Sequence, residues 1–445
     1  MKRTARIALA IAGLLSTVPG QALTLQQAFE QARDYDAQLA AARAAAAGDQ
    51  ARARIAKSRL LPQVSASLTA GKQWTSTHYL SGLYPDSHDE YEPLNWSLNA
   101  QQALYAPADW RDWKKAEASA RSSALWVKAQ ADDLLARVIK AYVQIVNAKA
   151  QIKVAQQDEA RYGQVLKQAE AAFAQGQGTR TDIDDARAKR DQAHAERVRR
   201  QGELALALNQ LALLTGKPVQ ADDIQPPPRA ETLAEQVLKH PLDFWKKTQQ
   251  RHNPEIHAMQ AQIDAATLEV SRQQAGHLPT ATVSLSRRKN KSDSETTIGR
   301  EYDTTSALIQ VSIPLYSGGG VSASVDAARA DLQQTRARYQ ARLRELNQAL
   351  TDSYLRIVHL RAQLAALLQT RHSAEQAVAA TQKGLAAGTR NTIDLLNAQQ
   401  DLSQVNGQLA DTRAALLVQI GQLYALVYPA NQALSQLLQL NSDGE

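Results

Sequence analysis

Residues 172–186 read AFAQGQGTRTDIDDA, and residues 384–398 read GLAAGTRNTIDLLNA. The two stretches align without a gap at an offset of about 212 residues. The same alignment continues over residues 140–217 and 352–429. Repetition of one supersecondary unit within a chain indicates an array or a symmetric assembly. The second half of the chain is therefore predicted to repeat the fold of the first half.

Each repeat contains a proline-free run of roughly 110 residues, from 108 to 217 and from 315 to 428. Alanine-rich runs without proline favour long helices whose backbones can approach closely. Glycines interrupt both runs, at residues 176–178 and 384–388. A long helix that folds back at a glycine turn makes an antiparallel coiled-coil hairpin. The two expected helical hairpins span residues 107–215 and 320–428.

Upstream of each helical run, apolar and polar residues alternate with a period of two. The alternation covers residues 64–70 and 96–100 in the first repeat, and 281–286 and 307–313 in the second. Segments of about ten residues that are apolar on one face are typical of membrane strands, although a soluble hairpin with one wet face has the same pattern. The predicted β-hairpins span about 63–104 and about 280–315, with polar tips at 72–93 and 287–303.

Residues 1–22 have the layout of a secretory signal. Basic residues come first, a short apolar run follows at 7–15, and Gly20-Gln21-Ala22 forms a cleavage site. A retained N-terminal helix is the alternative. No other segment has 18 consecutive apolar residues, so the chain could cross a membrane only with strands. Four strands cannot close a barrel, whereas three copies would supply about twelve strands.

The remaining segments complete a plan of two repeats. A helix is expected before each strand pair, and a proline-containing linker separates the repeats. The expected parts are the signal (1–22), the first repeat (23–218), a linker or equatorial segment (219–251), the second repeat (252–429) and a C-terminal tail (430–445).

Composition excludes several functional classes. The chain has no cysteine, which excludes disulfides, thiolate-ligated metals and a lipidated N-terminal cysteine. The net charge of +7 comes from basic residues that alternate with acids along helices, so we expect no nucleic-acid partner. Neither a phosphate-binding glycine loop nor a nucleophile elbow is present, so we expect no enzymatic activity, no cofactor and no metal.

With these features in place, the chain resembles the TolC family of outer-membrane export channels. The most specific part of the resemblance is residues 388–398, which are close to the family pattern at the periplasmic entrance. The resemblance implies a homotrimer in which a 12-stranded β-barrel in outer-membrane lipid continues into an α-helical barrel that extends into the periplasm. It also implies a periplasmic adaptor and an inner-membrane pump as partners.

The resemblance assigns roles to residues at the entrance. Acidic residues form a cation-selective ring in the family, and the matching positions here are Asp394 and Asn397, so each subunit supplies one carboxylate instead of two. A latch that closes the entrance matches Asp182 and Arg390, while Leu385 replaces the family tyrosine. An exposed ion pair of this kind stabilises by about 0–1 kcal/mol. Asp184 and Asp185 could share the role of the ring.

Aromatic residues at the strand ends are the last candidates. Tyr105 and Tyr316 occupy equivalent places in the two repeats, and Trp110 follows the first. Aromatics at a strand-to-helix junction suit a membrane interface, and packing between helices is the alternative. The basic stretch 287–291 could meet lipopolysaccharide phosphates, or it could be an ordinary solubilising loop.

The leading hypothesis is a passive exit duct for type I protein secretion, drug efflux or both. The alternative is a periplasmic coiled-coil adaptor or scaffold without a membrane barrel. A cytosolic scaffold would require the signal to be dismissed. The sequence does not identify the cargo, the pump or the adaptor.

Overall fold

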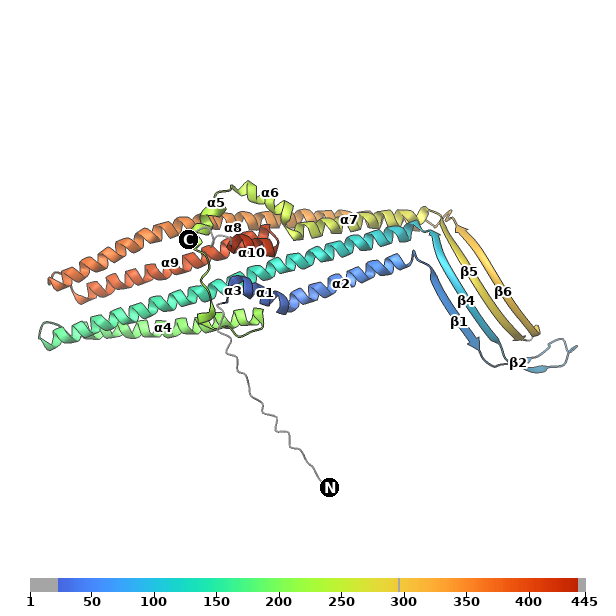
Figure 1. Ribbon diagram of the computed structural model, residues 1–445, viewed down its shortest axis with the longest axis horizontal. Helices are drawn as coiled ribbons and strands as arrows, with labels where there is room; N and C mark the ends of the chain where they lie inside the picture. Colours follow the sequence, from blue (N-terminus) through green and yellow to red (C-terminus); the bar gives the residue numbers. More distant parts are fainter. Residues whose placement is uncertain (1–22, 295–296, 439–445) are drawn as a thin grey trace, which may run out of the picture. The chain divides into compact units, whose positions relative to one another are not determined.

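The computed structural model describes residues 23–294 and 297–438 and is mainly helical (Figure 1). The expected signal at 1–22 and the end of the expected tail, 439–445, lie outside the described residues. Contacts divide the chain into two units. The first unit holds the residues up to Asp36, Asp132–Trp245 and the residues from Leu350 onward, and the second holds Ala37–Ala131 and Lys246–Ala349.

The second unit combines strands with helices. Its helices are α2 (Ala37–Ser58), α7 (Pro254–Gln274), the short η2 (Ala275–His277), most of α6 (Leu242–His252) and the first parts of α3 (Pro107–Ala174) and α8 (Gly320–Ala386). Its strands are β1 (Gln63–Ala70), β2 (Gln73–Thr77), β3 (Ser87–Tyr91), β4 (Leu94–Tyr105), β5 (Thr280–Ser294) and β6 (Thr297–Ser312).

Four of the strands form one antiparallel sheet in the order β1-β4-β5-β6 (Figure 1). The first hairpin pairs Val64 with Ala100 and Leu68 with Trp96. The second hairpin joins it through β4 and β5, which pair Ala100 with Leu285. The strands of both repeats thus build a single sheet, and β1 and β6 are its two edges within the described residues.

The two faces of this sheet differ in chemistry. Register places one set of apolar side chains on one face, and these are 46% to 72% exposed: Val64, Leu68, Leu98, Leu285 and Ile309. The opposite face is mostly polar, with Ala103 and Leu308 as apolar members, and hydroxyl pairs cross it between neighbouring strands, Ser67 to Ser97 at 2.9 Å and Ser286 to Ser306 at 2.8 Å. The alternation that predicted strands therefore also gives the sheet one apolar face and one polar face.

Both expected polar tips contain additional strand. The segment 72–93 holds the small hairpin of β2 and β3, which pairs Trp74 with Glu90. The tip expected at 287–303 is wrong in extent, because β5 continues to Ser294 and β6 begins at Thr297. Cross-strand ion pairs explain how charged residues continue this ladder: Arg287 with Asp303 at 3.0 Å, and Lys289 with Glu301.

The first unit is helical. Its elements are α1 (Leu25–Tyr35), the later parts of α3 and α8, α4 (Arg180–Thr215), the short η1 (Ala221–Asp223), α5 (Ala230–Leu238), the start of α6, α9 (Thr392–Val427) and α10 (Ala430–Leu438). None of the helices within the described residues carries an apolar stretch long enough to cross a membrane.

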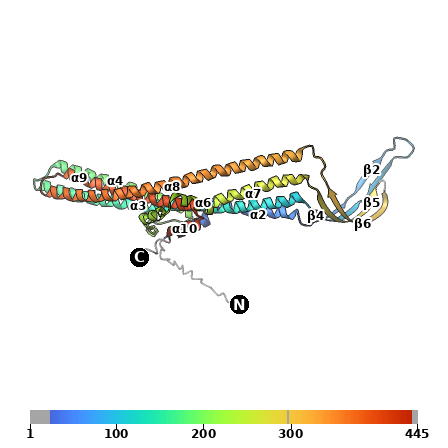
Figure 2. The ribbon, with the colours of Figure 1, turned by 90° about the horizontal axis from the view of Figure 1, so that it is seen from above.

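The duplication seen in the sequence is present in the helices. α4 and α9 each contain 36 residues. Both follow a long helix, of 68 residues for α3 and 67 residues for α8. Figure 2 shows the turns of the two helical hairpins at the same end of this unit. The helical hairpins expected from the proline-free runs are both present.

Tyr142 anchors the middle of the first unit. Its side chain is buried, and its hydroxyl lies 2.6 Å from the carbonyl oxygen of Gln225 and 2.8 Å from that of Leu23. Burial raises the pKa of Tyr142 to about 12, so the phenol stays protonated and can donate. This side chain ties Leu23, just before α1, and Gln225, between η1 and α5, to α3.

We predict that Tyr142→Phe lowers the free energy of unfolding by about 1–2 kcal/mol, because the carbonyl oxygen of Gln225 loses its donor and that of Leu23 keeps only the Gln225 amide. The measurement is denaturant unfolding followed by circular dichroism. Tyr354→Phe is the matched control, since Tyr354 is the aligned residue of the second repeat and its hydroxyl bonds to His240 O at 3.3 Å in an exposed setting. Equal losses in both variants would contradict the prediction.

Candidate functional site

Two glycine turns join the long helices, and both adopt the same backbone conformation. Gly176 has a φ of 76°, and the next amide donates to Ala172 O at 2.9 Å. Gly388 has a φ of 74°, and the next amide donates to Gly384 O at the same distance of 2.9 Å. Glycine adopts this left-handed conformation without a Cβ penalty, which closes the end of the helix. The two sequence repeats are therefore alike even in the hydrogen bonds of their turns.

Both candidate aspartates complete capping boxes at the starts of the returning helices. Thr179 Oγ1 accepts from Asp182 N at 3.2 Å, and Thr179 N donates to Asp182 Oδ2 at 3.0 Å. Asn391 Oδ1 accepts from Asp394 N at 2.8 Å, and Asn391 N donates to Asp394 Oδ2 at 3.2 Å. Each box satisfies two helix-end donors and places a carboxylate at the positive end of the helix dipole. Each aspartate thus has a structural role within its own chain.

Asp182 also links the two repeats. Hydrogen bonds from the Thr179 hydroxyl and the Thr179 amide hold the pKa of Asp182 below its usual value, against the opposing effect of burial. The hydroxyl of Thr392 adds a smaller contribution in the same direction. Thr392 is the first residue of α9, so this carboxylate contacts both returning helices.

Arg390 is oriented by its own turn. Its Nη1 lies 3.8 Å from Asp394 Oδ2, and its side chain is 60% exposed. Gly384 leaves room for it, because a Cβ at that position would approach Arg390 Cγ to 2.7 Å. Within a single chain, Arg390 therefore pairs with Asp394, and no ion pair joins it to Asp182 among the described residues. The Asp182–Arg390 latch stays a prediction.

The other entrance positions lie around the same turn. Asp394 and Asn397 are three residues apart on the accessible side of α9, opposite the buried Leu395 and Leu396. Asp184 lies 3.6 Å from Arg180 and 3.7 Å from Arg187, whose cations partly neutralise it. Leu385, which stands where the family has a tyrosine, packs against the buried core of the tips.

That core joins all four long helices below the turns. It is a single cluster of aliphatic side chains and one tyrosine from α3, α4 and α9: Tyr162, Val165, Leu166, Ala169, Ile183, Ala186, Ala193, Leu395 and Leu396. Val378 and Leu385 of α8 pack against it. The two helical hairpins of one chain are therefore held together at their tips by burial of apolar surface.

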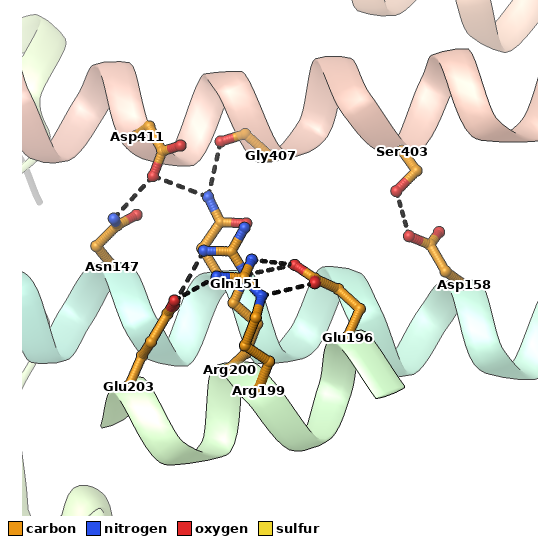
Figure 3. A network of polar contacts seen from close by, with 10 residues as sticks. All are labelled: Asn147, Gln151, Asp158, Glu196, Arg199, Arg200, Glu203, Ser403, Gly407 and Asp411. Atoms are coloured by element: carbon orange, nitrogen blue, oxygen red, sulfur yellow. Dashed lines mark hydrogen bonds and ion pairs between the residues drawn. The ribbon is translucent and has the colours of Figure 1, made fainter. Parts of the chain in front are cut away.

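Farther along the hairpins, a network of polar contacts also joins α3 to α9 (Figure 3). Gln151 is buried, and its Nε2 donates to Gly407 O and to Asp411 Oδ1, both at 2.9 Å. Asn147 donates to the same carboxylate oxygen at 2.9 Å. A Cβ at Gly407 would lie 3.4 Å from Gln151 Oε1, which is an ordinary van der Waals contact, so the approach does not depend on glycine.

The network continues on both sides. Asp158 of α3 is buried and accepts from Ser403 of α9. On α4, two glutamates flank two arginines, and four ion pairs within this helix join them: Glu196, Arg199, Arg200 and Glu203 (Figure 3). Arg199, and secondarily Arg200, lower the pKa of Glu196 to about 2. The contact between Ser403 and Asp158 joins α9 to α3, and buried polar contacts of this kind hold a specific register between helices.

Sequence reasoning missed this network. In the sequence of an alanine-rich helix, a buried glutamine or aspartate cannot be told from one on a solvent-exposed face. Whether it is buried depends on a helix more than 200 residues away in the chain. Gly407 was the one available signal, since a glycine inside a helix costs about 1 kcal/mol relative to alanine and so suggests a close contact.

The candidate membrane-interface aromatics lie in the second unit. Tyr105 is 50% exposed and Tyr316 is 88% exposed. Trp110 is 53% exposed and packs edge-to-face on Trp113, with ring centroids 5.0 Å apart. The alternative role for these three residues is packing between helices. At least half of each side chain is exposed within the single chain, so packing inside the chain does not cover them.

The part of the chain that the structure describes contains no cluster of three or more acidic, histidine or cysteine residues arranged to hold a metal ion. In the loop between β2 and β3, His78 Nδ1 lies 2.6 Å from Asp86 Oδ2. This contact is a single exposed pair, with both side chains more than half accessible.

The lowered pKa of Asp182 predicts a pH-dependent first turn. Because its pKa is lower in the folded chain than in an unfolded one, its contribution to stability is present above the unfolded value of about 3.9 and is lost as the pH falls through the folded pKa. Hydrogen exchange of residues 176–184, corrected for intrinsic rates, should accelerate below pH 4. Thr179→Ala should weaken this dependence, and an unchanged dependence in that variant would contradict the assignment.

Comparison with known proteins identifies the family. The family model described as outer membrane efflux protein matches residues 28–217 and 246–427. The chain is similar to the alkaline protease secretion protein AprF of Pseudomonas aeruginosa, with 30% identity over 88% of this chain and 82% of the relative. It is also similar to the proteases secretion protein PrtF of Dickeya chrysanthemi, with 28% identity over 93% of this chain and 89% of the relative.

The fold has counterparts among solved structures. The crystal structure of CusC, whose description refers to transmembrane channel formation, superposes with a TM-score of 0.75 at 19% identity, covering 91% of this chain and 92% of that one. The matched regions include both helical hairpins, and the findings support an outer-membrane export channel rather than a periplasmic adaptor. The chain belongs to the outer membrane efflux protein family.

Proposed function

We propose that three copies of this chain form a channel-tunnel: a 12-stranded β-barrel in the outer membrane that continues into a helical barrel in the periplasm. It serves as a passive exit duct and has no catalytic role. The observation that carries the proposal is the four-stranded sheet, which has one apolar face, one polar face and two unpaired edges, and which is attached to long helical hairpins.

The unpaired edges favour an oligomer. β1 and β6 each expose a row of backbone donors and acceptors within the described chain. In lipid, an unsatisfied backbone group costs several kcal/mol, so an open sheet edge is not tolerated there. Pairing β1 of one copy with β6 of the next removes all edges, and three copies bring the strand number to about twelve, within the range of membrane barrels.

The apolar face fits a lipid-facing surface of tilted strands. Its apolar residues run from 64 to 70 on β1, but on β5 they run only from 281 to 285 before Arg287 and Lys289 follow on the same face. Leu285 pairs with Ala100, which in turn pairs with Val64, so the apolar residues of β1 and β5 extend in opposite directions from this level and the apolar band crosses the sheet obliquely. Strands in membrane barrels tilt by about 35–45°, which would bring such an oblique band level with the membrane.

The helical tips would form the periplasmic entrance. Threefold symmetry brings three copies of Asp394 around one axis, and like charges held close together attract cations. Asn397, on the same side of the helix, contributes no charge, so this ring has three carboxylates where two acidic positions per subunit would give six. Cation selectivity and block by divalent cations then depend on Asp394.

The latch would operate between subunits. Within one chain, Asp182 is engaged by Thr179 and Thr392, and Arg390 by Asp394. Both side chains are nevertheless on the accessible tip, where Arg390 could exchange Asp394 for Asp182 of a neighbouring copy. A contact worth about 0–1 kcal/mol is weak enough for a docking partner to break.

A duct of this kind requires an energy source, so the proposed partners are an inner-membrane pump and a periplasmic adaptor. The cargo proposed first is secreted protein, by type I export, because AprF and PrtF are named for protease secretion. Drug efflux through the same duct is the second candidate, supported by the family description.

The ring generates one prediction. Asp394→Asn should reduce cation selectivity and divalent-cation block in planar bilayers, while preserving the capping box because asparagine keeps an acceptor oxygen. Asn397→Asp should change both properties in the opposite direction, since it restores a second carboxylate. If selectivity and block are unchanged in both variants, the ring is not the selectivity element.

The latch generates another. Asp182→Asn and Arg390→Ala should each raise the resting conductance of the closed channel and the sensitivity of cells to large antibiotics. Arg180→Ala is the control, because Arg180 lies at the same tip but pairs with Asp184. Resting conductance equal to the parent in both latch variants would remove the latch from the account.

The chain has no native cysteine, so the geometry of the latch can be tested directly. Oxidation of the double variant Asp182→Cys and Arg390→Cys should give a covalent trimer on a denaturing gel if the contact joins neighbouring subunits. A protein that remains monomeric on the gel, with both thiols consumed, would place the contact within one chain instead.

A further inference from the structure

A compact cluster of lysine and tryptophan lies in the second unit, where β4 leads into α3. Lys114 Nζ lies 4.2 Å from the ring centroid of Trp113, and Lys57 Nζ of α2 lies 5.3 Å from the same centroid. Trp110 packs edge-to-face on Trp113. We refer to Lys57, Trp110, Trp113 and Lys114 as the Lys-Trp cluster.

The cluster is accessible and carries positive charge. Lys57 is exposed, and no acidic partner lies within ion-pair distance of it among the described residues. Lys114 has a side chain that is 42% exposed and shares its charge with Glu117 at 3.1 Å. The neighbouring carboxylate of Asp112 is paired with Arg59 at 3.0 Å. The cluster therefore keeps a surplus of cation at its surface.

The Lys-Trp cluster lies next to the end of the sheet, where the side chains change from apolar to aromatic to basic. The apolar face of the sheet reaches Val64 at the start of β1, and Tyr105 ends β4. The tryptophans follow within two turns of α3, and Lys57 lies in the last turn of α2. A membrane interface shows the same order of groups: apolar surface comes first, aromatic rings follow, and long lysine side chains then reach the headgroups.

The duplicated fold shows that helix packing alone does not require the cluster. The start of α8 corresponds to the start of α3, and Tyr316 corresponds to Tyr105. Residues 320–328 nevertheless contain neither an aromatic nor a basic residue. The cluster is thus a feature of one repeat only.

We propose that the Lys-Trp cluster binds the phosphate headgroup of an anionic phospholipid in the leaflet next to the helices. This inference rests on the proposed function, since it requires the sheet to lie in the outer membrane. The two ammonium groups, both close to the Trp113 ring, would donate to phosphate oxygens. The exposed ring of Trp110 would contact the glycerol and upper acyl region of the same lipid.

The test uses the purified full chain, exchanged into an equimolar mixture of phosphatidylglycerol and phosphatidylcholine. Native mass spectrometry counts each lipid retained by the protein. The parent should prefer phosphatidylglycerol, and Lys57→Gln with Lys114→Gln should lower this preference by about fivefold for each lysine. Lys57→Arg with Lys114→Arg should keep the preference, because the charge remains.

Lys128→Gln is the matched control. Lys128 is an exposed lysine on the same helix, 14 residues beyond Lys114 and about 21 Å farther along. A loss in Lys128→Gln equal to that of the double variant would overturn the inference, and so would an unchanged preference in the double variant. Displacement of the retained phosphatidylglycerol by excess inorganic phosphate alone would overturn it too, because the site would then be a free-anion site.

Bilayer conductance measured on the same preparations separates the two proposals. If the parent conducts but shows no preference for phosphatidylglycerol, only the headgroup site fails. If the parent neither assembles nor conducts, the proposed function fails as well. A double variant that conducts as the parent does, yet has lost the lipid preference, supports both.

Discussion

Backbone groups at the edges of the sheet constrain the rest of this molecule. One chain builds four strands with an apolar face, but β1 and β6 keep unpaired edges that lipid does not tolerate. We propose that pairing β1 of one copy with β6 of the next closes these edges. Three copies would give about twelve strands and would place the helical tips around a common axis.

The helical tips combine rigid and weak elements. Glycine turns and capping boxes fix the backbone of each tip, and an apolar cluster joins the two hairpins beneath them. The side chains on the accessible surface, Asp182, Arg390 and Asp394, make exposed contacts that are individually weak. Farther along, Gln151 and Asp158 set the register of α3 against α9 through buried polar contacts. Tips built this way can change their surface contacts without unfolding their helices.

Local signals in the sequence predicted most of the architecture. Proline-free runs, glycine turns and alternating residues indicated the helical hairpins and the strands, because each depends on nearby residues. The sequence did not predict the extent of β5 and β6 beyond Arg287, since ladder charges there are compensated by partners on the opposite strand. Nor did it predict that Asp182 and Asp394 cap their helices, or that Gln151 is buried against Gly407, because the latter contact joins distant parts of the chain. The periodic pattern around a residue therefore predicted its structural role better than the residue type alone.

The most direct measurement of the central claim is single-channel conductance of the detergent-purified, signal-processed protein, with the oligomer mass determined on the same sample. The account predicts a trimer that inserts into a planar bilayer and gives small, long-lived, cation-selective openings, blocked by divalent cations from one side. A protein that remains a monomer and never enters the bilayer would contradict the account.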